Sequence, residues 1–133
     1  QLSLQPDKDP AWHIALGRAL RPLREQGVLI VGSGSITHNL RAIFKHPPGA
    51  PVREWVTEFC DWMAAKIKAG DLEALSSYRT LAPHAVQNHP TDEHLLPLFV
   101  ALGAANRIDT AHHLNHVMTY GFLAMDMWLF DAA

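Results

Sequence analysis

Residues 27–41 read GVLIVGSGSITHNLR, and this stretch decides the fold class. Its apolar part, 28–31, is rich in β-branched residues, has no polar interruption and is bracketed by glycines. Such a run predicts a strand that is buried on both faces of a parallel or mixed sheet. The preceding segment predicts a helix, because Asp9 can cap it, Pro10 suits its first position and Gly27 suits its end. A helix followed by a buried strand indicates an α/β domain, a mixed sheet flanked by helices.

The rest of the chain adds further helices and another strand. From Val52 onward, apolar residues recur at steps of three and four, which predicts a core-facing helix that ends at Gly70. Asp71 is suited to cap a second, short helix. The closing run FLAMDMWLF, residues 122–130, is apolar on both alternating faces. We therefore expect another buried strand there, with Asp126 as its exception.

Length and composition set the outer bounds. The chain has 133 residues, of which 48% are hydrophobic, and a formal charge of -2, which predicts one globular domain. It has no cluster of Lys and Arg that would favour nucleic acid or an acidic membrane, and no apolar run of transmembrane length. The single cysteine, Cys60, excludes an internal disulfide framework and fits a reducing, cytoplasmic compartment. Because the first residue is not Met, we expect a fragment.

Nine histidines are the strongest compositional signal, since imidazole is the commonest metal ligand and titrates near neutrality. His38 follows a loop of small residues, 32–35, at the carboxyl end of the predicted strand, where open α/β sheets place their ligand crevices. The Gly-x-Gly piece of this loop lacks the third glycine and the Lys-Ser/Thr pair of phosphate loops, which disfavours a phosphate site. His38 is a candidate general acid/base, and a loop histidine bonded for shape is the alternative.

A second candidate lies in HPTDEHLLPLFVALGA, residues 89–104. Thr91 is a good N-cap, and the two acidic residues after it suit the positive end of a helix. His94 is then expected in the first turn, from which its side chain can project into a crevice. Pro97 is expected to bend this helix near its start, unless the helix simply tolerates it.

A rival group consists of His112, His113 and His116. If this stretch is helical, His112 and His116 share one face at i, i+4, a spacing that can bind a metal ion. No glutamate accompanies them as in the H-E-x-x-H pattern. A polar helix face is therefore the favoured interpretation, and a zinc protein centred on this group is an alternative.

Three separated motifs together resemble the C-terminal half of the class III extradiol ring-cleavage dioxygenases. They are GVLIVGSGSITHNLR (27–41), APHAVQNHPTDEHLLPLFVALGAA (82–105) and YGFLAMDMWLF (120–130). The most similar branch is the DOPA 4,5-dioxygenase-like group, related to the catalytic subunit of protocatechuate 4,5-dioxygenase. The resemblance implies that residues 1–133 form the C-terminal portion of a larger catalytic domain. It also implies an enzyme that opens the ring of a catechol such as DOPA with O₂.

The same resemblance implies roles for individual residues. His38 would be the acid/base histidine, and His94 would be the third ligand of a non-haem Fe(II), with Glu93 as the runner-up ligand. Zinc could occupy such a site in place of iron. The residues then expected at the substrate are Ser33, Gly34, Ser35 and His89, with His84 as a further candidate near the pocket.

One departure from the family bears on the partners. Its other two metal-ligand histidines belong to the N-terminal half, and nothing in this chain matches their motifs. We therefore expect the missing N-terminal half or a second chain to supply them, while the small-molecule partners are a catechol and O₂. Neither nucleic acid nor a membrane is expected. A non-catalytic binding or scaffold protein on the same fold is the alternative to an enzyme.

Overall fold

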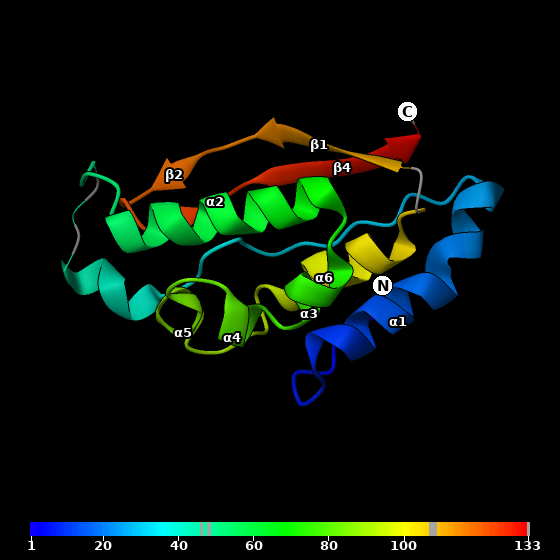
Figure 1. Ribbon diagram of the computed structural model, residues 1–133, viewed down its shortest axis with the longest axis horizontal. Helices are drawn as coiled ribbons and strands as arrows, with labels where there is room; N and C mark the ends of the chain where they lie inside the picture. Colours follow the sequence, from blue (N-terminus) through cyan, green and yellow to red (C-terminus); the bar gives the residue numbers. More distant parts are fainter. Residues whose placement is uncertain (46, 48, 107–108, 133) are drawn as a thin grey trace.

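The computed structural model describes residues 1–45, 47, 49–106 and 109–132 (Figure 1). Its α-helices are α1 (Pro10–Leu20), α2 (Glu54–Ala69), α3 (Leu72–Ser76), α4 (Tyr78–Leu81), α5 (Ala85–Asn88) and α6 (Leu96–Ala104). Two 3-10 helices are η1 (Arg21–Gln26) and η2 (Leu40–Lys45), and the strands are β1 (Asp109–Asn115), β2 (Met118–Thr119), β3 (Leu123–Ala124) and β4 (Met127–Ala132). The predicted α/β class is confirmed. Within these ranges no helix has both the length and the hydropathy needed to cross a bilayer.

The elements form layers that Figure 1 shows edge-on. The ribbon of β1 and β4 lies along one side with α2 next to it, and α6 and α1 lie toward the other side. Helices α1 and α6 pack closely: a Cβ added at Gly103 would lie only 2.1 Å from the carbonyl oxygen of Ile14, so only glycine fits there. The fully buried core side chains include Val56, Phe59, Leu75, Tyr78, Leu96, Phe99 and Phe122.

The predicted helix ends at Asp9, Gly27, Gly70 and Asp71 are confirmed. Asp9 caps α1 by accepting a hydrogen bond from the amide of Trp12 at 2.8 Å, and Asp71 caps α3 in the same way at 3.0 Å. Gly27 and Gly70 end η1 and α2 with φ angles of 78° and 63°. These positive angles are readily adopted by glycine and rarely by other residues.

The two predicted buried strands are wrong. Residues 28–31 are extended but have no strand partner among the described residues, and Leu29 and Val31 are 78% and 74% exposed. The stretch 122–130 is divided between β3 and β4, which belong to two separate two-stranded antiparallel ribbons. On β4 one face is open, since Met127 is 56% exposed.

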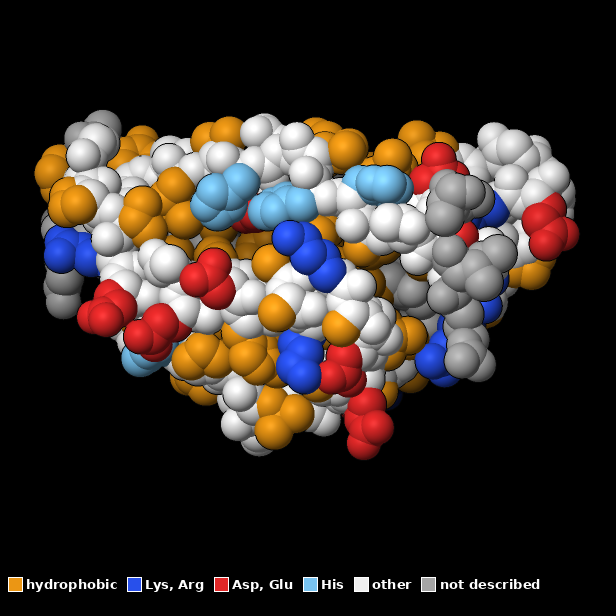
Figure 2. Space-filling model, turned by 45° about the horizontal axis from the view of Figure 1, so that its top comes forward, with side chains coloured by type: hydrophobic (Ala, Val, Ile, Leu, Met, Phe, Trp, Pro, Cys, Tyr) orange, Lys and Arg blue, Asp and Glu red, His pale blue; other side chains and the backbone are white. Residues whose placement is uncertain are grey.

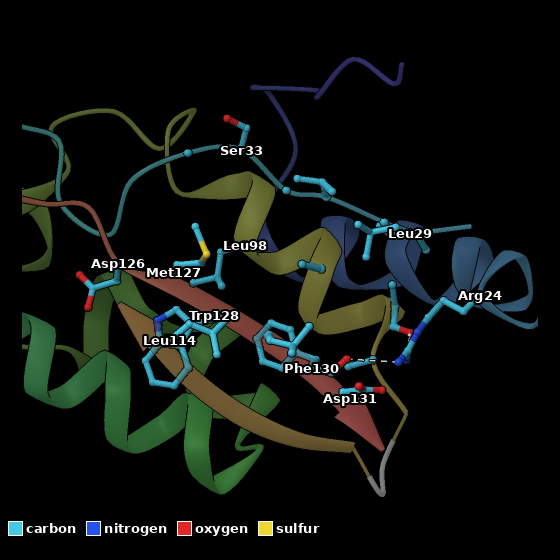
Figure 3. A pocket seen from close by; sticks show the side chains of 18 of the residues that line it. Arg24, Leu29, Ser33, Leu98, Leu114, Asp126, Met127, Trp128, Phe130 and Asp131 are labelled. Atoms are coloured by element: carbon cyan, nitrogen blue, oxygen red, sulfur yellow. Dashed lines mark hydrogen bonds between the residues drawn. The ribbon is translucent and has the colours of Figure 1, made fainter. Parts of the chain in front are cut away.

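Both errors concern the walls of one groove. The groove has a volume of about 960 Å³ and runs between the extended segment 28–36 and the chain from 125 to 131, with Leu98 of α6 between them (Figure 3). At one end Arg24 crosses toward β4 and donates a hydrogen bond to the carbonyl of Phe130 at 3.2 Å. The apolar side chains expected inside a sheet therefore border an open space, because no described strand lies between the two walls.

The start of α6 also differs from the prediction. The helix begins at Leu96, so Pro97 occupies the first turn, where its missing N–H is not needed, which favours the alternative that the helix tolerates it. Thr91 does not cap the helix, because its hydroxyl donates to the Glu93 carboxylate at 2.8 Å. His94 consequently lies in the turn just before α6 and not within its first turn.

Candidate active site

The two histidines selected from sequence lie in contact. The ring centroids of His38 and His94 are 3.5 Å apart and the ring planes differ by 16°, so the imidazoles are stacked. His38 is partly buried, whereas the His94 side chain is 44% exposed. The pair is therefore open to solvent on one side and supported by the protein on the other.

The glycine-rich loop approaches the backbone that carries His94. The amide of Ser35 donates to the carbonyl of His94 at 2.8 Å. A Cβ added at Gly34 would lie 2.2 Å from that same carbonyl oxygen, and one at Gly32 would lie 2.4 Å from the carbonyl oxygen of Pro97. Close approach to residues 94–97 thus explains both glycines of the Gly-x-Gly piece.

Thr37 anchors the residue before His38. Its side chain is fully buried, donates to the carbonyl of Phe122 at 2.6 Å and accepts from the amide of Ala124 at 2.7 Å. The amide of Ile36 adds a bond to the Ala124 carbonyl at 3.1 Å. Sequence reasoning missed Thr37, and its place beside His38 was the only available signal.

The far side of His38 is held by α5. The amide of His38 donates to the carbonyl of Asn88 at 3.0 Å, and the Asn39 side chain donates to the carbonyl of Gln87 at 2.7 Å. The buried Asn88 side chain in turn donates to the carbonyl of Trp55 on α2 at 3.1 Å. Bonds on both sides of His38 therefore fix the backbone from which its ring projects.

The loop before His94 is tied to α4. Arg79 forms an ion pair with Asp92 and donates to the carbonyl of His89 at 3.1 Å. The carbonyl of Asp92 accepts from the amide of Leu95 at 2.8 Å, which closes the turn that contains His94. Arg79 was not predicted as part of the site, because nothing in its local sequence indicates a partner thirteen residues later.

His89 lies beneath the loop. Its ring is 0% exposed and donates from Nε2 to the carbonyl of Ile36 at 2.6 Å. Burial lowers the pKa of His89 to about 4, so the ring is neutral near pH 7. The expected contact of His89 with substrate stays a prediction, and in this position the ring supports the backbone just before Thr37. Of the other expected substrate residues, Ser33 and Gly34 are exposed and Ser35 is partly buried.

The electrostatics of the pair favour a neutral His38. Burial, followed by the nearby His94, lowers the pKa of His38, while Glu93 acts in the opposite direction. The pKa of Glu93 is itself lowered, because its own amide and the Thr91 hydroxyl hydrogen-bond to the carboxylate. Glu93 Oε1 lies 3.5 Å from Nδ1 of His94. The site thus combines an unprotonated imidazole with a second imidazole beside a carboxylate.

The donor set fits a metal only in part. His94 and Glu93 are ligand types that Fe(II) and zinc accept. In the described part of the chain, three such ligand atoms come within 4.8 Å of one another at His113, His116 and Asp126, and not around His94. Among the described residues, His94 therefore has too few neighbouring ligand atoms to complete a metal site.

The helical interpretation of the rival histidine group is wrong. Residues 109–115 form β1, so His112 and His116 do not share a helix face. Instead His113 and His116 both approach Asp126, while His112 is exposed.

Known proteins match most of this chain. Residues 2–125 match the family model described as the catalytic LigB subunit of aromatic ring-opening dioxygenase. The "4,5-DOPA dioxygenase extradiol" of Mirabilis jalapa is 43% identical over 107 residues, covering 80% of this chain and 39% of that protein. The protein of the same name from Beta vulgaris is 39% identical over 127 residues, covering 91% of this chain and 46% of that protein.

A solved structure also has the fold of this chain. An uncharacterized protein from Escherichia coli K12 superposes with a TM-score of 0.82 at 32% identity, over 95% of this chain and 52% of that one. The chain thus spans about half the length of the relatives that it matches. From the family match, the sequence identities and the shared fold, the chain belongs to the class III extradiol dioxygenases, the family of the LigB catalytic subunit.

Proposed function

We propose that this chain carries the acid/base histidine, His38, and one metal ligand, His94, of an extradiol dioxygenase that opens the ring of a catechol-type aromatic with O₂. The observation that carries the proposal is the stacking of these two rings. Their motifs are far apart in the sequence, yet both rings meet at one partly open site. A scaffold protein on the same fold would not require this juxtaposition.

His38 is the proton carrier in this proposal. Its lowered pKa leaves one ring nitrogen free of a proton at neutral pH, as a general base requires. The ring can accept a hydroxyl proton from the catechol and return it later in the reaction. The bonds from Thr37 and Asn88 hold its backbone in place, so the ring can exchange a proton without a rearrangement of the loop.

His94 holds the metal in this proposal, with Fe(II) as the expected ion and zinc as an ion that the same ligand accepts. When bound, the metal supplies a positive centre that brings catechol and oxygen together. Glu93 is the runner-up ligand. Its carboxylate lies beside Nδ1 of His94, where a carboxylate typically orients a metal-binding imidazole and leaves the other nitrogen for the metal.

The substrate is proposed to approach along the glycine-rich loop. Ser33, Gly34 and Ser35 line the same groove as His94, and Figure 3 shows Ser33 on the extended segment at its rim. Two of these three residues are exposed, which leaves their backbone accessible to a ring. His89 is proposed to support this surface through the Ile36 carbonyl.

Residues 1–133 are proposed to be the C-terminal portion of a larger catalytic domain, completed by an N-terminal half on the same or on a second chain. The groove supports this inference, because its walls are two extended apolar segments that were expected inside a sheet. Neighbouring strands lie about 4.8 Å apart, so a groove of this kind suits inserted strands. That half would also supply two more histidine ligands. A cytoplasmic location is proposed only from the single, unpaired Cys60.

The test is anaerobic loading of the chain, completed by the N-terminal half, with Fe(II), followed by oxygen and DOPA. A yellow ring-fission product and stoichiometric oxygen uptake are expected. His38→Phe should keep the iron and lower turnover by about 10²- to 10⁴-fold, the usual contribution of general acid/base catalysis. His94→Ala should lose the iron. Full activity of the first variant, or stoichiometric iron in the second, would contradict the assigned roles.

A further inference from the structure

A second group of metal-type ligands lies at the end of the β1–β4 ribbon. It consists of His113 on β1, His116 just after β1, and Asp126 just before β4. The group shares no residue with the His38 and His94 pair. Figure 2 shows histidine side chains close together on the face that carries this ribbon, among apolar side chains.

A β-bulge brings the two histidines to one side. Side chains of a strand alternate between its faces, so residues three positions apart normally point to opposite faces. Here His113 is opposite Trp128 and Asn115 is opposite Met127, so β1 has one extra residue in this interval. The extra residue reverses the alternation beyond it. His113 and His116 therefore both reach the same carboxylate.

The ligand atoms are close enough to hold one ion. His113 Nε2 lies 2.5 Å and His116 Nδ1 lies 2.7 Å from Oδ1 of Asp126, and all three ligand atoms are within 4.8 Å of one another. The two imidazoles are inclined at 70°, so they approach the carboxylate from different directions. A metal bound to two nitrogens and an oxygen at about 2.0–2.2 Å needs only a small widening of these separations.

The carboxylate gives an independent reason to expect a cation. The Asp126 side chain is 5% exposed, and its second oxygen, Oδ2, is buried without a hydrogen-bond partner in the described structure. Buried carboxylate oxygens are normally satisfied by donors or by metal ions. The two histidines both address Oδ1, so they leave Oδ2 unsatisfied.

The surroundings suit a partly preformed site. The His113 ring stacks on Trp128 with centroids 4.1 Å apart and planes 3° apart, which fixes its orientation. The His116 side chain is 52% exposed and leaves an entry path from solvent. Two imidazoles and one carboxylate form a donor set that zinc and other divalent transition metals accept.

We propose that His113, His116 and Asp126 form a site for a divalent transition metal, with Zn²⁺ as its probe, separate from the proposed catalytic centre. A metal bound there would connect the end of β1 to the start of β4 and stabilise the ribbon. Both histidines would then carry their N–H on the ring nitrogen that faces away from the ion.

The experiment is calorimetric titration of the metal-free 133-residue chain with Zn²⁺ alone, in a His38→Ala/His94→Ala background that removes the two histidines of the proposed catalytic centre. His116→Ala, at a half-exposed position, should weaken binding at least ~10-fold without unfolding the chain. Asp126→Asn should weaken it as well. His112→Ala, on the same strand but outside the group, should bind as the background does.

The ring resonances of His113 and His116 should shift on Zn²⁺ addition, while those of His112 should not. Unchanged affinity in His116→Ala, or no Zn²⁺ binding by the folded background protein, would overturn the proposal. If Asp126→Asn does not fold by circular dichroism, the His116→Ala comparison decides alone.

Discussion

The stretch 27–41 contains two regions that differ sharply in how they are supported. Its second part, from Ser35 to Asn39, is held by hydrogen bonds to β3, α5 and the turn before α6, and by one bond from the amide of Ala124 on β3. Its first part, 28–31, has the more hydrophobic sequence, yet it lies on the surface beside a groove. Contacts within this chain thus hold the backbone around His38 and leave the adjacent apolar segment 28–31 largely exposed.

The two regions should depend differently on the rest of the domain. The geometry of His38 and His94 should persist in the 133-residue chain, because their supporting residues all belong to it. The packing of 28–31 and of the open face of β4 should depend on a partner, because each exposes large apolar side chains. Substitutions around His38 should therefore lower the stability of the isolated chain. Substitutions in 28–31 should instead weaken binding of the N-terminal half and leave that stability nearly unchanged.

The largest loss of stability is expected where the glycine-rich loop contacts the backbone of His94. In Gly34→Ala, the new Cβ would lie 2.2 Å from the carbonyl oxygen of His94, so the loop must move away from the turn before α6. Overpacking of this kind costs roughly 3 kcal/mol. Urea unfolding measures the loss, and Ser33→Ala, at an exposed neighbouring position, is the control with little expected change. Equal stability of the two variants would contradict the close packing.

Acid should weaken the same region through His89. Its pKa is about 4 in the folded protein against an ordinary value of 6.5, so the unfolded chain binds the proton more readily. The stabilisation is complete above pH 6.5 and is lost as the pH falls toward 4, with a maximum loss of roughly 3 kcal/mol. Urea unfolding from pH 7 to pH 4 measures this slope. His89→Gln should reduce the dependence of the free energy of unfolding on pH. An unchanged dependence would mean that other groups cause it.

A smaller loss is expected from Thr37→Val, which keeps the shape and removes the hydroxyl. The carbonyl of Phe122 and the amide of Ala124 would then be buried without this partner, at a cost of about 2 kcal/mol. The denaturant midpoint should fall, and Thr37→Ser should restore most of it. A Thr37→Val protein as stable as the unmodified chain would show that the hydroxyl does not secure the loop.

The smallest effect on the chain alone is expected in the groove wall. Leu29→Ser/Val31→Ser changes side chains that are 78% and 74% exposed, so unfolding should shift by less than about 0.5 kcal/mol. Binding of the N-terminal half should nevertheless weaken, which a pull-down or calorimetry can measure. A large loss of stability in the isolated chain, or unchanged binding, would remove the distinction between the two regions.

Features that depend on residues close together in the sequence were predicted correctly, and features that depend on distant residues were not. The caps at Asp9 and Asp71 and the helix ends at Gly27 and Gly70 were predictable, because each depends on residues only a few positions away. Local motifs also singled out His38 and His94. Thr37 and Arg79 were not predictable, because their partners lie far away in the sequence or in loops without a pattern.

The amino-acid sequence by itself determined the α/β class and the helix ends at Asp9, Gly27, Gly70 and Asp71, since local spacing and chemistry specify these features. Its motifs, through their resemblance to a known family, also selected the two histidines of the candidate site. Only the tertiary structure decided that Leu29 and Val31 are exposed, that Pro97 lies in the first turn of α6, and that a bulge in β1 directs two histidines to Asp126. The physical reason is that burial and strand pairing depend on neighbours, which local periodicity does not specify.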